Sequence, residues 1–334
     1  MMLKLMKRLM ALIVLILAGC LTGFFYLIQL PHAFSPSRLI VEIQFGKSLR
    51  LLSREFTQLG LIENPQLFEG LVRLSANAAH VKSGNYEIHS PISAFQLMQK
   101  ITGHDSDQST VRLVEGWNFQ QVRRALDDNE ALTHESRDLS DQDIAKALGI
   151  SGSVLEGLVY PESYFSPRGT SDLRVLARGY SRMQQVLENE WSSKSDDLPL
   201  ESPYEALILA SLVEKETGRA EDRDMVSSVF VNRLRKNMRL QTDPSVIYGM
   251  KNTYTGHLKH HDLLVDTPWN TYTRSGLPPT PIALAGLAAL KAALHPRVSD
   301  KLYFVARGDG SSQFSTTLEE HNLAVKRYQR SGKP

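Results

Sequence analysis

Hydrophobic side chains follow three different patterns along the 334 residues of this chain. An uncharged run extends from Leu9 to Leu30, short mixed patterns cover residues 38–103, and mainly helical spacing follows from residue 110. The uncharged run from Leu9 to Leu30 is long enough to cross a lipid bilayer as a helix. The pattern therefore predicts a transmembrane helix at residues 9–30, followed by two folded regions.

The charges next to the apolar run predict the orientation of this helix. Lys4, Lys7 and Arg8 precede it, whereas positive charges are sparse in the segment that follows. Positively charged flanks of membrane helices stay in the cytoplasm. We therefore expect residues 1–8 to form a cytoplasmic tail and the chain after the helix to lie outside the cytoplasm.

The residues Leu17-Ala18-Gly19-Cys20 allow a second interpretation, because they resemble a bacterial lipoprotein processing box. A cleaved secretion signal is a third, but its apolar core would be shorter. The residues after Cys20 stay apolar, which favours an uncleaved anchor over a lipid-modified cysteine. Cys20 is also the only cysteine, so we expect no disulfide and no catalytic thiol in the exported part.

Residues 38–103 have the pattern of a small mixed domain. Leu39, Val41 and Ile43 alternate with polar residues, as in a half-buried strand. Two helical segments, a returning strand and another helix are predicted at residues 49–59, 65–74, 86–88 and 93–101. The order strand–helix–helix–strand is similar to the LysM fold, a sugar-binding module of bacterial cell-wall proteins. A plain spacer domain is the alternative.

A polar segment at residues 104–110 separates this domain from a second one at residues 110–330. Helices are predicted at 119–126, 141–148, 173–191, 202–217, 223–236 and 283–294, and strands at 111–114, 303–306 and 313–315. We therefore expect an α+β chain whose larger domain is rich in helices and has a small β component.

The segment from Ser202 to Gly218 carries the strongest chemical signal. Ser202, Pro203 and Glu205 have the order of a capping box, which predicts the start of a helix. Residues 206–213 are nearly all apolar, so this helix is expected to be buried on every side. Gly218 ends the helix just after two carboxylates.

Those carboxylates, Glu214 and Glu216, are at the negative end of the helix dipole. Burial and the dipole both raise a carboxyl pKa, and a raised pKa suits a general acid near neutral pH. Because they are two positions apart, the two side chains point in nearly opposite directions. Glu216 has the more apolar neighbours and is the better candidate. The alternative is that both are solvated charges near Lys215 and Arg219.

Other kinds of site fit the sequence less well. Three histidines and Asp262 occur within residues 257–262, but they lack the helical spacing of a metal-binding pair and predict an exposed loop. We therefore expect no metal and no cofactor. Ser211 lies inside the apolar helix without a nucleophile elbow, which argues against a serine hydrolase. A net charge of +2 without a basic stripe argues against nucleic acid as a partner.

What remains is a carboxylic acid at the end of an apolar helix, followed by loops rich in Gln, Asn, Asp and aromatic residues. Sugars are bound by amide and carboxylate hydrogen bonds and by aromatic faces. Cleavage of a glycosidic bond requires an acid that protonates the leaving oxygen. The pattern thus indicates an enzyme that cleaves glycans.

Several motifs in order resemble the YceG-like family of endolytic murein transglycosylases. They are Leu212-Val213-Glu214-Lys215-Glu216-Thr217, residues 229–234 (VFVNRL), residues 238–249 (MRLQTDPSVIYG), and residues 270–272 (NTY) with 276–279 (GLPP). Residues 302–305 (LYFV) and His321-Asn322 extend the similarity, which covers residues 110–330.

The resemblance implies that Glu216 is the catalytic residue. It would protonate the oxygen between N-acetylmuramic acid and N-acetylglucosamine, and then act as a base on the muramyl C6 hydroxyl. The product would end in a 1,6-anhydro ring, as in a lytic transglycosylase. The chain departs from the expected pattern at Glu162, where Asp is expected after Pro161. This departure puts in doubt any catalytic role for that carboxylate.

The resemblance also implies a lysozyme-like catalytic domain. Its glycan groove would be lined by Gln241, Asp243, Asn270 and Tyr272. Asp243 has a structural interpretation as well, because an aspartate before Pro244 is typical of a helix N-cap.

Family membership would place the protein in the bacterial inner membrane as a single-pass protein with its catalytic domain in the periplasm. Its substrates would be peptidoglycan glycan strands, its neighbours would include proteins of peptidoglycan synthesis, and its cuts would end strand elongation. The competing hypothesis is a membrane-tethered, peptidoglycan-binding scaffold without catalysis. The retention of Glu216 in its apolar helix argues against that hypothesis.

Overall fold

The computed structural model describes residues 19, 23, 26–43, 46–75, 81–82, 84–103, 108–152 and 154–330. These residues form two compact units, one within residues 1–109 and 165–168, the other within 110–164 and 169–334. Residues 1–8, Cys20 and most of the predicted transmembrane helix lie outside the described part. Among the residues described, no helix is both long and apolar enough to span a membrane.

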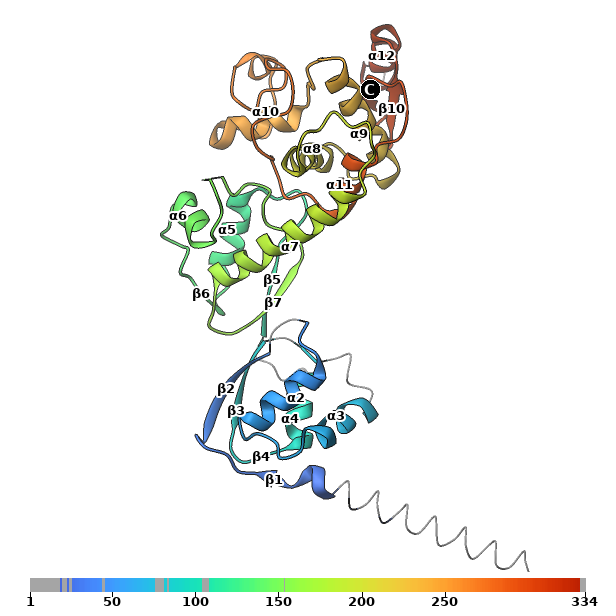
Figure 1. Cartoon of the computed structure of the whole chain (residues 1–334). Coiled ribbons are helices and arrows are strands. Elements are labelled where there is room, and N and C mark those ends of the chain that lie inside the picture. Colours follow the sequence, from blue (N-terminus) through green and yellow to red (C-terminus); the bar gives the residue numbers. More distant parts are fainter. Residues whose placement is uncertain are drawn as a thin grey trace, which may run out of the picture. The chain divides into compact units, whose positions relative to one another are not determined.

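The first unit is built on a pair of antiparallel strands, β2 and β3, whose register runs from Arg38 opposite His89 to Ile43 opposite Gly84. The two helices between these strands, the short pair β1–β4 and the helix α4 complete the unit (Figure 1). The bounds are β1 Pro31–His32, β2 Arg38–Ile43, α2 Leu49–Gln58, α3 Pro65–Leu74, β3 Gly84–His89, β4 Ile92–Ser93 and α4 Ala94–Thr102. The predicted order strand–helix–helix–strand is therefore observed.

Helix ends in this unit follow from local sequence. Asn64 caps α3 by accepting hydrogen bonds from Gln66 N and Leu67 N, both at 3.0 Å. Residues Phe56 and Phe68 pack edge to face in the core, with their ring centroids 5.7 Å apart. The amphipathic helices thus bury one side each against the sheet and against one another.

The second unit consists mainly of helices, with short two-stranded sheets. In chain order its elements are β5 Gln108–Arg112, α5 Phe119–Asp127, β6 Leu132–Thr133, α6 Asp141–Ala147, β7 Ser163–Pro167, β8 Thr170–Ser171, α7 Asp172–Ser192, α8 Pro203–Glu216, α9 Ala220–Arg235, α10 Asp243–Met250, η2 Lys251–Thr253, η3 Asp262–Leu264, α11 Leu287–Leu294, β9 Tyr303–Ala306, β10 Ser312–Ser315, α12 Leu318–Val325 and η4 Lys326–Arg330. Strands β5 and β7 extend past the borders between the units. The expected α+β class is confirmed.

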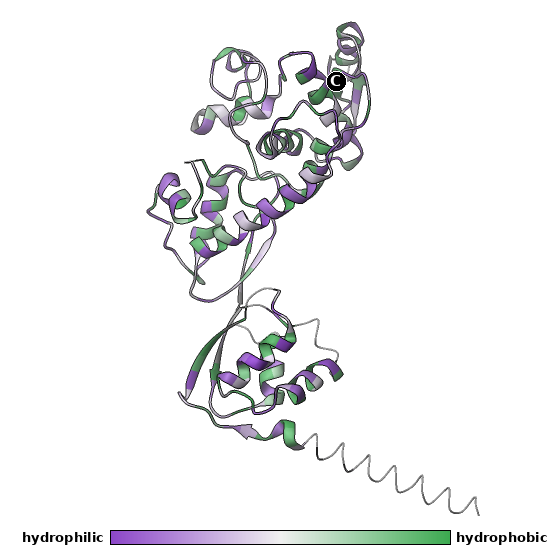
Figure 2. Cartoon of the chain, in the orientation of Figure 1, coloured by the Kyte–Doolittle hydropathy of each residue, from purple (hydrophilic) through white to green (hydrophobic). Residues whose placement is uncertain are grey.

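Helix α8 is the centre of the second unit. Residues 206–213 are all buried, and α8 packs against α7, α9, α10 and α11 (Figure 1). Figure 2 shows that most of α8 is hydrophobic. The predicted burial on every side is confirmed for residues 206–213, and the last turn of α8 lies at the edge of the packed core.

Two details of the predicted elements were wrong. Ser202 caps α8 through Glu205 N at 3.3 Å, but the Glu205 carboxylate accepts a hydrogen bond from Glu201 N instead of closing a capping box. The predicted helix at 283–294 begins only at Leu287. Leu284 instead bonds through its backbone with Gly116 and Trp117 (2.8 and 2.7 Å), and residues 283–286 form a connection outside the helix.

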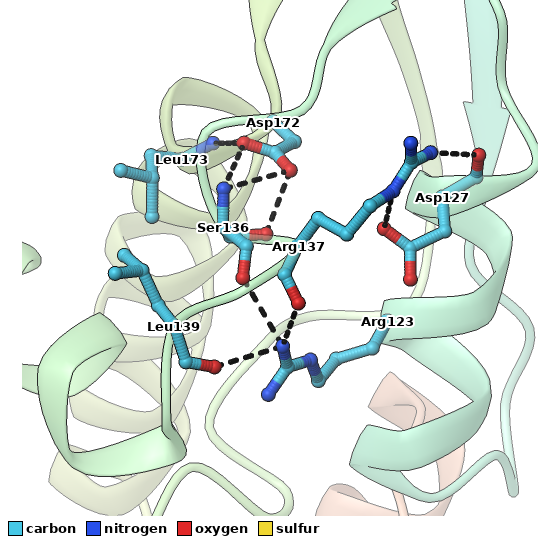
Figure 3. A network of polar contacts seen from close by, with 7 residues as sticks. All are labelled: Arg123, Asp127, Ser136, Arg137, Leu139, Asp172 and Leu173. Atoms are coloured by element: carbon cyan, nitrogen blue, oxygen red, sulfur yellow. Dashed lines mark hydrogen bonds and ion pairs between the residues drawn. The ribbon is translucent and has the colours of Figure 1, made fainter.

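A polar network holds the start of α7 (Figure 3). The Asp172 carboxylate accepts hydrogen bonds from the backbone N–H groups of Ser136 (3.1 and 3.2 Å) and Leu173 (2.8 Å), and from the Ser136 hydroxyl (2.7 Å). Arg123 donates to the carbonyl oxygens of Ser136, Arg137 and Leu139 at 2.9–3.1 Å. These contacts tie the loop before α6 to α5 and α7.

Candidate active site

Glu216 is the last residue of α8, and the chain leaves the helix in an extended conformation at Thr217. Its carboxylate oxygen Oε2 accepts a hydrogen bond from the Thr242 hydroxyl at 2.8 Å. Within the described residues, no group donates a hydrogen bond to the other oxygen, Oε1. The carboxyl group therefore has one fixed oxygen and one oxygen available for a ligand.

The pKa of Glu216 is raised from 4.5 to about 7, chiefly because burial penalises the charged form. The hydrogen bond from Thr242 lowers this pKa, the negative charge of Asp243 raises it, and the positive charge of Arg233 lowers it. The increase in pKa caused by burial is larger than the decrease caused by Thr242 and Arg233. A large fraction of Glu216 is consequently protonated at neutral pH, as a general acid requires.

Thr242 is the N-cap residue of α10, a position that the sequence assigned to Asp243. Its hydroxyl makes no capping bond to its own helix and instead binds Glu216. The backbone of Thr242 is held by the Thr271 hydroxyl, which accepts from Thr242 N at 3.0 Å and lies 2.8 Å from the Ser245 hydroxyl. Because these groups are buried, the donor to Glu216 is fixed in place.

Buried Arg233, on α9, organises the segment before Thr242. Its guanidinium donates to the carbonyl oxygens of Leu302 (2.7 Å), Arg239 (3.1 Å) and Leu240 (2.8 Å), and to Gln241 Oε1 (3.3 Å). Gln241 has a φ of 52°, a left-handed conformation that is unfavourable for a residue with a side chain. Strained backbone of this kind often occurs at functional sites.

Asp243 and Tyr272 form a polar pair next to Glu216. The Tyr272 hydroxyl donates to Asp243 Oδ1 at 2.6 Å, and Arg239 donates to the Tyr272 carbonyl at 3.0 Å. Gln241 and Asp243 are exposed, and Tyr272 is partly exposed. Burial, followed by the hydrogen bond to Asp243, raises the pKa of Tyr272. Of the four predicted substrate residues, Asp243 and Tyr272 therefore lie near Glu216, Gln241 directly precedes its partner Thr242, and all three reach the surface.

Asn270, the fourth of these residues, is fully buried. Its amide donates to the carbonyl oxygens of Leu263 (3.1 Å) and Val265 (2.7 Å), and its Oδ1 accepts from Tyr272 N at 2.8 Å. In this structure Asn270 holds the loop that presents Tyr272. Its predicted contact with substrate stays a prediction.

Glu214 points away from this group of residues, as its spacing from Glu216 predicts. Its Oε2 accepts a hydrogen bond from Gly286 N, at the start of α11, at 3.1 Å. Burial raises the pKa of Glu214, the bond from Gly286 lowers it, and the charge of Glu115 raises it again. A Cβ at Gly286 would lie 1.9 Å from Glu115 Oε1, so a larger residue there would displace the exposed Glu115 side chain. Glu214 thus connects α8 to α11.

A second carboxyl group with a strongly raised pKa, Glu156, lies elsewhere in the second unit. Both of its oxygens accept from Phe119 N (3.0 and 3.1 Å), and Oε2 also accepts from the Tyr248 hydroxyl (3.1 Å). Burial raises its pKa to about 7, against the lowering effect of these bonds. Glu156 is 6% exposed and borders a cavity of about 960 Å³ between α5 and α10.

Comparison with known proteins places this arrangement in a family. The model of the YceG-like family matches residues 41–327. This chain belongs to the YceG-like family.

Named relatives of this YceG-like chain share moderate sequence identity with it. An endolytic murein transglycosylase of Bacillus subtilis is 29% identical over 312 residues, which cover 88% of this chain and 86% of the relative. The endolytic murein transglycosylase of Streptococcus pneumoniae strain D39 is 26% identical over 348 residues, covering 93% of this chain. The match spans 62% of that longer protein. A crystal structure of a yceG-like protein from Listeria monocytogenes has a TM-score of 0.53 and 29% identity, over 86% of this chain and 99% of that one.

Sequence reasoning missed Glu156 and Arg233 in this YceG-like chain. Glu156 lies in a loop, and its partners Phe119 and Tyr248 are 37 and 92 positions away. Arg233 looks like one more charge on an amphipathic helix, because its contact with Leu302 is 69 positions away. Arg233 has a sequence signal in its place within the family motif at residues 229–234, whereas Glu156 lies outside the motifs quoted above.

Among the described residues, one group of side chains has ligand atoms close enough for a metal ion, namely Asp127, His134 and Asp172. The Asp172 oxygens are already used by the network in Figure 3, and Asp127 accepts from Arg137 Nε at 3.4 Å. The carboxylates of Asp127 and Asp172 are thus engaged by hydrogen bonds within the protein, which gives both a structural role. Asp262, from the histidine-rich segment, is likewise engaged by Lys259 N at 2.8 Å.

Proposed function

We propose that this protein is an endolytic lytic transglycosylase that cleaves the bond between N-acetylmuramic acid and N-acetylglucosamine in peptidoglycan strands. The observation that carries the proposal is Glu216, a carboxyl group with a pKa near 7, one oxygen held by Thr242 and the other available. The activity named for the Bacillus subtilis and Streptococcus pneumoniae relatives supports it.

In the first step, protonated Glu216 gives its proton to the glycosidic oxygen, and the bond from muramyl C1 to that oxygen breaks. The N-acetylglucosamine unit leaves with a free hydroxyl. Glu216, now a carboxylate, takes the proton of the muramyl C6 hydroxyl, and this oxygen bonds to C1. The product carries a 1,6-anhydro ring, no water is consumed, and Glu216 is protonated again.

One carboxylate is sufficient for this sequence because the substrate supplies the nucleophile. The Thr242 hydroxyl stabilises the carboxylate form that follows proton donation, and Arg233 contributes positive charge. Neutral acid and carboxylate are both accessible because the pKa is close to the working pH.

The neighbouring residues fit a glycan groove. Exposed Gln241 and Asp243 offer amide and carboxylate groups to sugar hydroxyls, and Tyr272 offers an aromatic face with its hydroxyl bound to Asp243. Asn270 acts by holding Tyr272 in place, and its direct contact with substrate belongs to the same proposal. The catalytic domain covers residues 110–330 and is lysozyme-like.

The proposal includes the setting of the enzyme. Residues 9–30 anchor it in the bacterial inner membrane as a single-pass protein, with residues 1–8 in the cytoplasm and the catalytic domain in the periplasm. Residues 38–103 form a LysM-like, glycan-binding domain, supported by the observed order of β2, α2, α3 and β3. In this position the enzyme cuts nascent strands next to the peptidoglycan synthesis proteins and ends strand elongation.

The test is an analysis of products. The full chain is incubated with uncrosslinked peptidoglycan strands, and the fragments are identified by mass spectrometry. The proposal expects 1,6-anhydro ends. Reducing ends would show a hydrolase instead, and binding without any cleavage would establish the membrane-tethered scaffold as the correct alternative.

A further inference from the structure

A wide cavity of the second unit lies between α5 and α10. Its volume is about 960 Å³, at the upper end of the range for ligand pockets and more than one sugar ring needs. Asn118 and Arg124 line it from α5 and Lys251 from the end of α10, while Tyr248 and Trp269 form an aromatic part of its wall. We call it the α5–α10 pocket.

Two residues of the pocket wall are chain neighbours of residues at the proposed active site. Lys215, the neighbour of Glu216 in α8, and Pro244, the neighbour of Asp243 in α10, both line it. The Lys215 ammonium group donates to the Gly116 carbonyl at 3.1 Å and so forms the border of the pocket on the side of α8. The wall of the pocket and the proposed acid therefore share helices α8 and α10.

Arg123 at the pocket pairs with Asp141, but three other positive side chains of the wall lack carboxylate partners among the described residues. Exposed Arg124, Lys215 and Lys251 have no carboxylate oxygen within 4.0 Å among the described residues. Lys251 lies over the Trp269 ring, with its Nζ 5.8 Å from the centroid.

The negative charges of the pocket are mostly engaged. Asp141 pairs with Arg123 at 2.9 Å, Asp127 pairs with Arg137 at 3.4 Å, and Glu156 is bonded to Phe119 N and the Tyr248 hydroxyl. Apart from these, Asp128 is the acid exposed at the pocket. The pocket therefore fits a ligand that carries more carboxylates than amines.

We infer that the α5–α10 pocket binds the peptide stem of a muramyl residue near the cleaved bond, with Arg124 and Lys251 recognising its carboxylates. This inference rests on the proposed function, because it assigns the stem-bearing strand as the substrate. Side-chain cations without carboxylate partners favour an anionic ligand over neutral sugars. Stem peptides carry free carboxylates and extend sideways from the glycan. The pocket thereby distinguishes stem-bearing strands from stripped ones.

The experiment measures binding, with Glu216→Gln in the full chain so that strands stay intact. One protein carries Arg124→Gln and Lys251→Gln in addition. A matched control carries Arg297→Gln and Lys236→Gln, two exposed cations of the same unit outside the pocket. Dissociation constants are measured for fluorescent strands that retain their stems and for strands stripped of stems by an amidase.

The inference expects the pocket variant to bind stem-bearing strands about 10-fold more weakly than the control, since each exposed charge contact contributes modestly. Binding to stripped strands should be equal in the two proteins. An equal loss on both kinds of strand would mean that the pocket contacts sugars, and no loss on either would mean that it contacts neither; both results overturn the inference. Failure of the proposed function is separate, because it would be seen as absent cleavage by the unsubstituted chain.

Discussion

Glu216 and Glu156 are two carboxyl groups of the same unit, the first partly buried and the second fully buried, and loss of solvent raises the pKa of each to about 7. Their surroundings differ. Both oxygens of Glu156 accept hydrogen bonds from Phe119 N, and the Tyr248 hydroxyl adds another. Glu216 receives a single described hydrogen bond, from Thr242, and has exposed polar neighbours.

The comparison shows that a raised pKa does not identify a catalytic acid by itself. The Glu156 side chain reaches the start of α5, where its oxygens accept from the Phe119 N–H group at the positive end of the helix. This role holds α5 to α10 through Tyr248 and leaves no oxygen free. Glu216 keeps an oxygen for a substrate, and that difference makes it the acid of the proposed reaction.

The largest expected effect is on the reaction rate of Glu216→Gln. The amide has the same shape but cannot donate or accept the catalytic proton, so the rate of strand cleavage should fall about 1,000-fold. Glu214→Gln is the matched control, because its amide oxygen still accepts from Gly286 N, and it should keep most of the activity. Equal losses in both variants, measured as anhydro ends released, would remove the distinction between the two residues.

The next effect concerns stability. Glu156→Ala leaves Phe119 N–H without an acceptor and opens space at the pocket, so the free energy of unfolding should fall by about 2–4 kcal/mol. The rate per folded molecule should change little. Denaturant titration and cleavage assays on the same samples measure the two quantities. Partly exposed Glu162→Ala is the control and should change stability little. A large rate loss with unchanged stability would assign Glu156 to the chemistry.

The pH profile tests the contact between Thr242 and Glu216. Cleavage needs the protonated acid, so kcat/KM should fall as the pH rises through about 7. Thr242→Val removes a donor that favours the carboxylate, so the descending limb should move up by about one pH unit. Thr242→Ser keeps the donor and should leave the limb in place. An identical pH profile in the wild type, Thr242→Val and Thr242→Ser would show that the Thr242 hydroxyl does not lower the pKa of Glu216.

The smallest effect is a pH-dependent stability difference. The folded chain holds the Glu216 proton up to about pH 7, while the unfolded chain releases it near 4.5. The free energy of unfolding of the wild-type protein therefore decreases as the pH rises from about 4.5 to about 7. This loss of stability remains at higher pH. Glu216→Gln avoids this cost. It should be more stable than wild type at pH 8 by an amount on the order of 1–3 kcal/mol, and the difference should shrink at pH 5. Thermal unfolding at both pH values checks the sign.

The predictable parts of this molecule are those whose signals are local. The apolar run of α8 and the position of Glu216 at its end follow from consecutive residues, as does the hairpin of β9 and β10, whose register pairs Ser312 with Ala306. Residues 283–286 were predicted as helix because they are apolar, but backbone bonds to Gly116 and Trp117 determine their conformation. Such long-range pairing has no local pattern.

The same reasoning applies to the site. Asp243 was expected to be the N-cap of α10, but Thr242 has that position and gives its hydroxyl to Glu216, 26 residues away. The anchoring of residues 239–241 by Arg233 also depends on a tertiary arrangement. Residue types could be predicted from the sequence, whereas the partners of each polar group could not.

The most direct test of the account is an NMR titration of the glutamate carboxyl carbons in the 13C-labelled protein, with Glu216→Gln and Glu156→Gln identifying the two signals. The account predicts that both carboxyls titrate near pH 7, and that only the Glu216 signal shifts when glycan strands are added. A Glu216 signal that titrates near 4.5, or one that does not respond to glycan, would contradict the assignment of Glu216 as the acid.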